Sequence, residues 1–383
     1  MSGLVAAVWF SRHIMICVER RRDRVLTEES PLASDDCPSV TVVVAAKDEA
    51  ENIEACVRSM LQQDYGNFRV VVANDRSEDG TGDIVRLLEG EDERVRLVNI
   101  TELPEGWCGK NNAMQTAIAA TDSEWICMID ADCVQTSRKS LSVAVQYALN
   151  SGADLLSVLP NLEMKGFWEN VIQPVCGGIM MIWFLPEKVN SPNKPNAYAN
   201  GAFMLMRRSA YQAVGTHEAV KDAVNEDMHL AARTKQAGLN LRVIRNRDLY
   251  KVRMYTSLAQ ILRGWGRIFY GTFGTVKRLT ISLLVLVIMG LVPYLAAVFG
   301  FLAIAAGNSE WAVACAIAGS AAMVMQVSVI YRFYKLIGAR KELAWTYAIG
   351  CGMAIAALFI SLSKLRKGAR LTWRGTSYNS AGQ

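Results

Sequence analysis

The chain has 383 residues, of which 51% are hydrophobic and 20% charged, and its formal net charge is +5. This composition excludes a disordered chain, a collagen-like chain and a small disulfide scaffold. The mean hydropathy of +0.16 is high for a soluble enzyme and low for a pure transporter, which indicates two unlike parts. Nine cysteines without a C-x-x-C pair, and only three histidines, favour buried thiols over a zinc site.

The N-terminal segment is apolar but short. Residues Ser2–Val18 are interrupted by Arg12 and His13, and four arginines follow between positions 20 and 24. Because the basic cluster follows the apolar run, the pattern favours a membrane anchor or interfacial helix over residues 1–24 rather than a signal peptide. The polar, turn-rich residues 25–38 then predict a linker.

Strands and helices alternate between residues 39 and 130. β-branched runs predict strands, and apolar residues at helical spacing predict the helices between them. This order is typical of an open, mostly parallel α/β sheet. The expected strands are Ser39–Ala46, Phe68–Ala73, Val95–Ile100 and Trp125–Ile129, and the expected helices are Glu51–Gln62, one starting at Ile84, and Asn111–Ala120.

Acidic residues follow these strands, namely Asp48 and Glu49, Asp75, and Asp130 and Asp132. Ligands of open α/β sheets bind beyond the carboxyl ends of the strands. The chain has neither G-x-G-x-x-G after its first strand nor a P-loop, so a classical dinucleotide or P-loop site is not expected. The Asp130-Ala131-Asp132 triplet instead offers hard oxygen ligands for Mg²⁺ or Mn²⁺, which would hold a diphosphate.

Two further places carry candidate functional residues. Glu226 and Asp227 precede a predicted helix, where carboxylates are favourable, and a capping role is compatible with a catalytic one. Lys110 is predicted either to contact phosphate or to be a solvated loop lysine. The segment Gly166–Pro186 is apolar apart from Glu169 and predicts an interfacial segment, with a core helix as the alternative.

Three C-terminal stretches, Leu279–Gly307, Trp311–Tyr331 and Leu343–Ser363, contain no charged residue and are long enough to cross a bilayer. Positive-inside counting places the basic clusters before the first stretch in the cytoplasm, but a third crossing would send the basic tail outside. One stretch being re-entrant or interfacial would resolve the conflict. The basic excess at this end favours contact with anionic lipid, and no nucleic-acid partner is expected. The predicted parts are thus an α/β domain over 39–278, membrane helices over 279–363 and a basic tail over 364–383.

Residues 39–270 resemble family 2 glycosyltransferases. The family's motifs recur in order as the opening strands with Asp75, the Asp130-Ala131-Asp132 triplet, Glu226-Asp227, and Gln260-x-x-Arg263-x-Trp265. A second set is similar to membrane glycosyltransferases of hopanoid and carotenoid synthesis, and more distantly to ceramide glucosyltransferases. It comprises Leu103-Pro104-x-Gly106-Trp107-x-Gly109-Lys110, Asn200-Gly201, Gly215-Thr216-His217, Gly264-Trp265-x-x-x-Phe269 and Trp373-Arg374-Gly375-x-x-Tyr378.

The chain also departs from the family pattern. Asp48 stands where the family usually has Asn, and Asn74 and Arg76 replace an Asp and a Gly of the second-strand loop. Gly264 stretches the Q-x-x-R-W motif, which weakens any inference from processive polysaccharide synthases.

The resemblance implies an A-type glycosyltransferase fold with C-terminal transmembrane helices and an inverting, metal-dependent transfer from a nucleotide sugar, with UDP as the expected nucleotide. Asp227 would be the base that accepts the proton of a lipid hydroxyl, and Glu226 would orient it. The remaining implied roles are nucleotide-sugar binding for Asp48, Glu49, Asp75, Lys110 and Asp130, metal binding for Asp132 with Asp130, and acceptor or diphosphate contacts for Gln260, Arg263, Trp265 and His217.

Several alternatives stay open at this stage. A polyprenyl-phosphate sugar synthase would need no general base, and a catalytically inactive nucleotide-sugar-binding scaffold would need no turnover. A processive polysaccharide synthase would usually need more membrane helices. The expected location is the cytoplasmic membrane, with the catalytic domain facing the cytoplasm.

Overall fold

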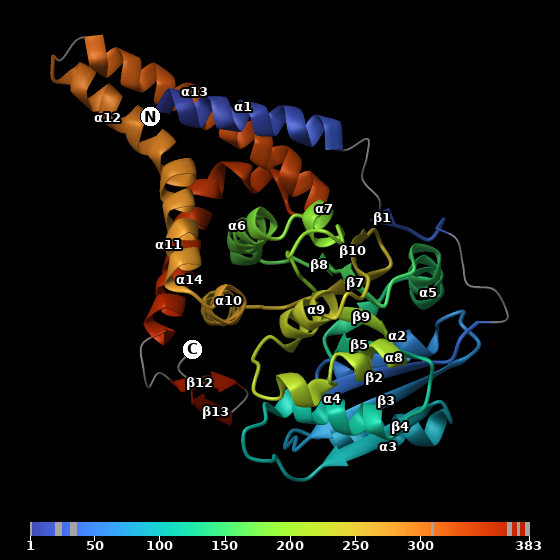
Figure 1. Cartoon of the computed structure of the whole chain (residues 1–383). Helices are drawn as coiled ribbons and strands as arrows, with labels where there is room; N and C mark the ends of the chain where they lie inside the picture. Colours follow the sequence, from blue (N-terminus) through green and yellow to red (C-terminus); the bar gives the residue numbers. More distant parts are fainter. Residues whose placement is uncertain are drawn as a thin grey trace.

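The computed structural model describes residues 2–19, 25–30, 37–307, 310–365, 370–373 and 376–379. The arginines at positions 20–24 and most of the predicted basic tail lie outside these residues. An α/β half adjoins a bundle of long helices, and helix α10 (Leu258–Phe273) lies between them (Figure 1). A short C-terminal hairpin is formed by β12 (Arg370–Trp373) and β13 (Thr376–Asn379).

The α/β half is built on an eight-stranded mixed sheet of order β1-β10-β7-β9-β5-β2-β3-β4. The four predicted strands pair in parallel, as do β1, β10 and β7, and β9 runs antiparallel between β5 and β7. Residues 25 and 26, predicted as linker, instead add the edge strand β1 beside β10. The strands are β1 (Val25–Leu26), β2 (Val40–Ala46), β3 (Phe68–Asp75), β4 (Val95–Ile100), β5 (Trp125–Asp130), β7 (Leu155–Leu159), β9 (Phe203–Arg207) and β10 (Leu241–Asn246).

Helices cover both faces of this sheet because its central strands are apolar on both sides. In β2, Val42 and Val44 contribute to one buried cluster and Val43 to the other, as the two-residue period of a strand requires. The first face carries α2 (Ile53–Leu61), α3 (Thr81–Glu91) and α5 (Ser140–Ser151). The second carries α4 (Gly109–Ala119), α8 (Arg208–Ala213), η1 (His217–Val220) and α9 (Glu226–Gln236).

A second layer leads from the sheet to the helical bundle. A small sheet of β6 (Cys133–Gln135), β11 (Tyr250–Val252) and β8 (Asn161–Leu162) begins directly after Asp132. It is followed by α6 (Phe167–Trp183) and the short α7 (Pro186–Val189). The predicted interfacial segment is therefore a regular helix, which packs through Val171 and Val175 against the bundle and leaves Ile182 near its end exposed.

Among the described residues, three helical stretches are long and apolar enough to cross a membrane, namely Val276–Ala305, Glu310–Ile337 and Lys341–Lys364. The first consists of α11 (Val276–Val285), the π-helical turn η2 (Leu286–Leu291) and α12 (Val292–Ala305). The second is α13 (Glu310–Ile337), and the third joins η3 (Lys341–Thr346) to α14 (Tyr347–Lys364). The N-terminal helix α1 (Ser2–Glu19) packs along α13.

The π-helical turn η2 ends two residues before Pro293, which has no N–H to donate. Backbone carbonyls freed in an apolar bundle need other donors. The Gln326 amide supplies one to the carbonyl of Met289 at 2.7 Å, and the Trp9 indole supplies a second to the same oxygen at 3.1 Å. The irregular turn thus joins α1 and α13 to the first apolar stretch.

Helix α14 contacts the α/β half along its length. Near its start, Gly350 lies against the backbone of Val171 in α6, an approach that a Cβ would prevent. Near its end, the Ser361 hydroxyl donates to the carbonyl of Gly266 in α10 at 2.7 Å. Helix α11 starts three residues after α10 ends. The start of α11 and the end of α14 are therefore beside the same helix, which favours a re-entrant or interfacial position for α14.

We expect residues at the start of α11 and at the end of α14 to face the same side of the membrane. Lys277→Cys and Ser363→Cys should react with a membrane-impermeant thiol reagent from one side, and Glu310→Cys from the other. The measurement is labelling of sealed vesicles of known orientation.

The parent for this labelling carries Ser at Cys17, Cys37 and Cys315, of which the last two are partly exposed, whereas the six other cysteines are buried. Labelling of Lys277→Cys and Ser363→Cys from opposite sides would show that α14 crosses the bilayer.

Candidate active site

A cleft of about 820 Å³ opens at the carboxyl ends of β2, β3 and β5 and continues to α10 and the end of α14. Its position is the one expected for a ligand site in an open α/β sheet. Sequence-predicted residues that line it are Glu49, Asp75, Lys110, Asp130, Asp132, Glu226, Asp227, Gln260 and Arg263.

The Lys110 ammonium lies at the centre of the cleft. Its Nζ is 2.7 Å from Asp130 Oδ1 and 2.7 Å from Glu226 Oε1. Burial alone would lower the pKa of Lys110, but the two carboxylates outweigh burial and raise that pKa well above its ordinary value. Lys110 is therefore charged and enclosed, and the prediction of a solvated loop lysine is wrong. Contact with phosphate stays a prediction.

Asp132 lies near two other carboxylates, and the Lys110 ammonium offsets their repulsion only in part. Burial, together with the carboxylates of Asp130 and Glu49, raises the pKa of Asp132 to about 7. Ala131 between the two aspartates belongs to the core, and both aspartates line the cleft. A divalent cation would relieve this repulsion, so the donor set fits Mg²⁺ or Mn²⁺. No three His, Cys, Asp or Glu side chains of the described chain form a complete cation site, so a ligand would have to supply further oxygens.

Asp227 is held rigidly at the first turn of α9. Its Oδ2 accepts a hydrogen bond from the Gly201 N–H at 2.9 Å, and its Oδ1 accepts one from the Met228 N–H at 2.7 Å. Burial and the neighbouring Glu226 carboxylate raise the pKa of Asp227 to about 7. A buried carboxylate with a pKa near neutrality, lining a cleft, has the properties of a general base.

Two neighbours of Asp227 explain this geometry. A Cβ at position 201 would lie 3.2 Å from the Lys110 Nζ. Glycine at this position therefore lets the backbone of residue 201 lie close to both Lys110 and Asp227. Asn225 donates to the Thr272 hydroxyl of α10 at 2.8 Å, and this bond joins the start of α9 to the helix on the membrane side. Asn225 and Thr272 line the cleft as well.

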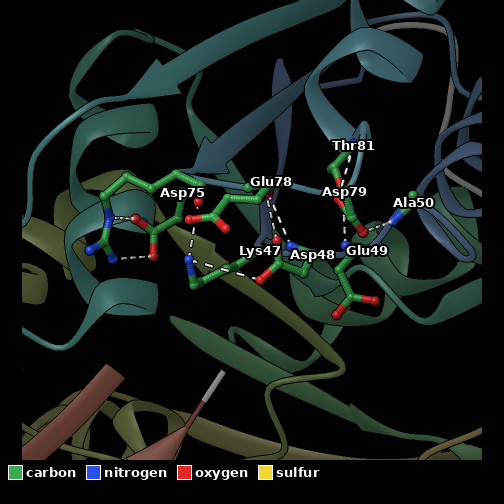
Figure 2. A network of polar contacts seen from close by, with 10 residues as sticks. Lys47, Asp48, Glu49, Ala50, Asp75, Glu78, Asp79 and Thr81 are labelled. Carbon is green, nitrogen blue, oxygen red and sulfur yellow. Dashed lines mark hydrogen bonds and ion pairs between the residues drawn. The ribbon is translucent and has the colours of Figure 1, made fainter. Parts of the chain in front are cut away.

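Figure 2 shows the opposite end of the cleft, where the loops after β2 and β3 meet. The Arg76 guanidinium pairs with both carboxylate oxygens of Asp75 at 2.7 and 3.0 Å. Asp48 accepts a hydrogen bond from the Glu78 N–H at 2.9 Å and does not line the cleft. Asp48, whose φ is +52°, therefore braces the loop after β3, while Glu49 and Asp75 face the cleft.

Two predicted acceptor-side residues lie elsewhere. Trp265 is buried among apolar residues and packs on Phe269 at a ring distance of 5.4 Å, because its position on α10 faces the bundle. His217 is fully buried and its Nδ1 lies 2.7 Å from the Tyr211 hydroxyl. Burial lowers the pKa of His217 to about 3, so it is a neutral core residue. Neither side chain lines the cleft.

Other residues that line the cleft belong to no motif found in the sequence, namely Lys47, Tyr198, Tyr255, Arg267 and Lys364. One signal was present for Tyr255. Gly264, which stretches the Q-x-x-R-W motif, lies where a Cβ would collide with the Tyr255 hydroxyl. The extra glycine thus makes room for a tyrosine in the cleft wall.

Known proteins share parts of this architecture. The chain is 24% identical over 255 residues to 4,4'-diaponeurosporenoate glycosyltransferase of Staphylococcus aureus (strain bovine RF122 / ET3-1), a match covering 66% of each chain. It is 24% identical over 200 residues to beta-monoglucosyldiacylglycerol synthase of Trichormus variabilis, covering 51% of this chain and 41% of that protein. The leading curated relatives are thus matched over about half to two thirds of their length.

The fold has a solved counterpart in mannosyltransferase PcManGT from Pyrobaculum calidifontis in complex with GDP-Man and Mn²⁺. The TM-score is 0.52 at 17% identity, over 94% of this chain and 99% of that one. This likeness shows the A-type (GT-A-like) α/β fold. Residues 41–215, which carry the Asp130–Asp132 triplet, Lys110 and Gly201, match the family model described as Glycosyl transferase family 2. The part of the chain over residues 41–215 therefore belongs to glycosyltransferase family 2.

Proposed function

We propose that the protein transfers a sugar from a nucleotide sugar to a hydroxyl group of a membrane lipid, with inversion at the anomeric carbon. The observation that carries this proposal is the cleft itself. One end holds the strand-end carboxylates and Asp227, and the other is walled by α10 and α14, the latter an apolar helix. Relatives named for glycosylating a carotenoid acid and a diacylglycerol support a lipid acceptor.

The donor would lie with its nucleoside near Glu49 and Asp75 and its diphosphate near Asp130 and Asp132. A divalent cation bound with Asp132 would supply Lewis-acid stabilisation of the diphosphate leaving group. The PcManGT complex contains Mn²⁺ and GDP-Man, which supports such a cation in this fold. Lys110 is positioned to add a further positive charge on the same side.

Asp227 would act as the general base. The acceptor oxygen forms a bond to the anomeric carbon while the bond from that carbon to the diphosphate oxygen breaks. The acceptor proton passes to Asp227, and the nucleoside diphosphate leaves. The two backbone hydrogen bonds to Asp227 fix its orientation without occupying all of its lone pairs.

The catalytic half would face the cytoplasm. Lys277 and Arg278 begin the first apolar stretch, and positively charged residues are enriched on the cytoplasmic side of membrane helices. Nucleotide sugars are then available from the same compartment.

The direct test is release of nucleoside diphosphate from a panel of nucleotide sugars with membrane lipid extract and Mn²⁺ or Mg²⁺. We expect turnover that chelation abolishes and that Asp132→Ala lowers by about 10²-fold or more, since a catalytic cation stabilises the transition state by several kcal/mol. Nucleotide binding without turnover would instead identify an inactive scaffold.

Replacing Asp227 with asparagine should lower kcat by about 10²- to 10⁴-fold, because general base catalysis supplies a factor of this size. Because Asp227 must be ionised to accept a proton, kcat/KM of the wild type should rise with pH up to about 7 and then level off. Initial rates from pH 5 to 9 measure both effects. Near-normal turnover by Asp227→Asn would point to an acceptor that is already ionised, such as a lipid phosphate.

Lys110→Met should destabilise the fold by about 3–5 kcal/mol, because it leaves the buried Glu226 carboxylate, and beside it the partly exposed Asp130 carboxylate, without their cation. Added Mn²⁺ should restore part of this loss by supplying positive charge at Asp130. Chemical unfolding with and without Mn²⁺ measures both. Lys221→Met is the matched control, since Lys221 pairs with Glu218 at the surface and such pairs contribute about 0–1 kcal/mol. Equal losses in the two variants would contradict a structural role for the Lys110 bridge.

A further inference from the structure

The cleft carries opposite charges at its two ends. The end at the sheet is acidic, because the carboxylates of Glu49, Asp75, Asp130 and Asp132 line it. The membrane end is basic and is formed by α10 and the last residue of α14. The three cationic residues that line it are Arg263, Arg267 and Lys364.

These three residues lie close together for reasons of local geometry. Arg263 and Arg267 are one helical turn apart on α10 and therefore project from the same face. Lys364 lies within electrostatic reach of Arg267, because Ile360, one turn before it, packs on Gly266 of α10. The ion pairs found within the described part of the chain include neither Arg263 nor Lys364.

A buried hydrogen-bonding group adjoins this basic cluster. The Tyr255 hydroxyl is inaccessible to solvent and has no hydrogen-bond partner in the described structure. It lies against Gly264, between Arg263 and Arg267 along α10. Buried polar groups in native proteins are nearly always paired. An anionic ligand at this end would therefore meet three cations and a phenol that lacks an acceptor.

Apolar side chains flank the cations. Met180 of α6, Ile268 of α10 and Ile360 of α14 line the same part of the cleft, and the neighbouring Phe359 is 57% exposed. Cationic groups at the end of an apolar helix lie at the depth of lipid headgroups. This combination fits an amphiphile whose charged head enters the cleft and whose chain lies along α14.

We propose that Arg267 and Lys364, together with Arg263, bind the acid group of an anionic lipid, so that the acceptor carries a carboxylate or phosphate near the hydroxyl that receives the sugar. This inference rests on the proposed lipid glycosylation and specifies its substrate class. The donor diphosphate is the competing occupant. Its place beside Asp130 and Asp132 would leave the cations at the end of α14 for a second ligand.

The test measures binding by the full-length protein in neutral detergent. Hexadecanoate, hexadecyl phosphate and hexadecanol are titrated separately, so that the two acids are distinguished from each other and from an uncharged head. The variant is Arg267→Gln with Lys364→Gln, and the matched control is Lys277→Gln with Lys335→Gln. The control removes two exposed cations near the membrane that do not line the cleft.

We expect the wild type and the control to bind at least one acid about tenfold more tightly than the alcohol, and the cleft variant to lose that preference, as expected for lost charge-assisted hydrogen bonds. Equal binding of acids and alcohol by the wild type, or equal losses in variant and control, would overturn the inference. A weakened donor Kd with unchanged acid binding would assign the cations to the diphosphate and also overturn it.

The proposed function is tested by a separate measurement, the release of nucleoside diphosphate. Absence of nucleoside diphosphate release with lipid extract would refute lipid glycosylation even where acid binding persists. Release of nucleoside diphosphate, together with equal binding of the acids and the alcohol, would refute only the anionic acceptor. Circular dichroism and thermal unfolding of the cleft variant establish that it is folded.

Discussion

The Lys110 ammonium, enclosed between Asp130 and Glu226, is the interaction on which the site depends. It joins the start of α4, the end of β5 and the start of α9, three elements far apart in the sequence. Without it, the carboxylates that converge on the cleft would repel one another in a poorly solvated space. One internal cation thus allows an acidic cleft to exist before any ligand enters, and it holds α9, with Asp227, at a fixed place.

Much of this arrangement could be predicted from the sequence. The β-branched runs located the four parallel strands, and the carboxyl ends of those strands located Glu49, Asp75, Asp130 and Asp132. Such local patterns suffice because strand direction and side-chain alternation are fixed by backbone geometry. The antiparallel insertion of β9 and the pairing of β1 with β10 were not predictable, since both depend on long-range contacts that no short pattern encodes.

The sequence was less informative about residues whose role depends on the direction in which the side chain points. Trp265 and Arg263 share a motif, yet they lie on different faces of α10, so one enters the apolar core and the other the cleft. Asp48 takes a left-handed backbone conformation that turns it toward the loop after β3. The glycine that separates Arg263 from Trp265 is explained only by Tyr255, which lies outside the motif and fills the space that a side chain would need.

The packing of α1 on α13 has a consequence for how the chain is made. Helix α1 precedes the α/β half in the chain, whereas the helix it packs against follows that entire half. Likewise, the Trp9 indole can donate its hydrogen bond to the carbonyl of Met289 only after Met289 has been synthesised. The α/β half is therefore synthesised while α1 still lacks the helix it packs against, and the bundle closes only after α13 has been made. The contacts that join α1 to the bundle thus form after the α/β half that separates them in the chain.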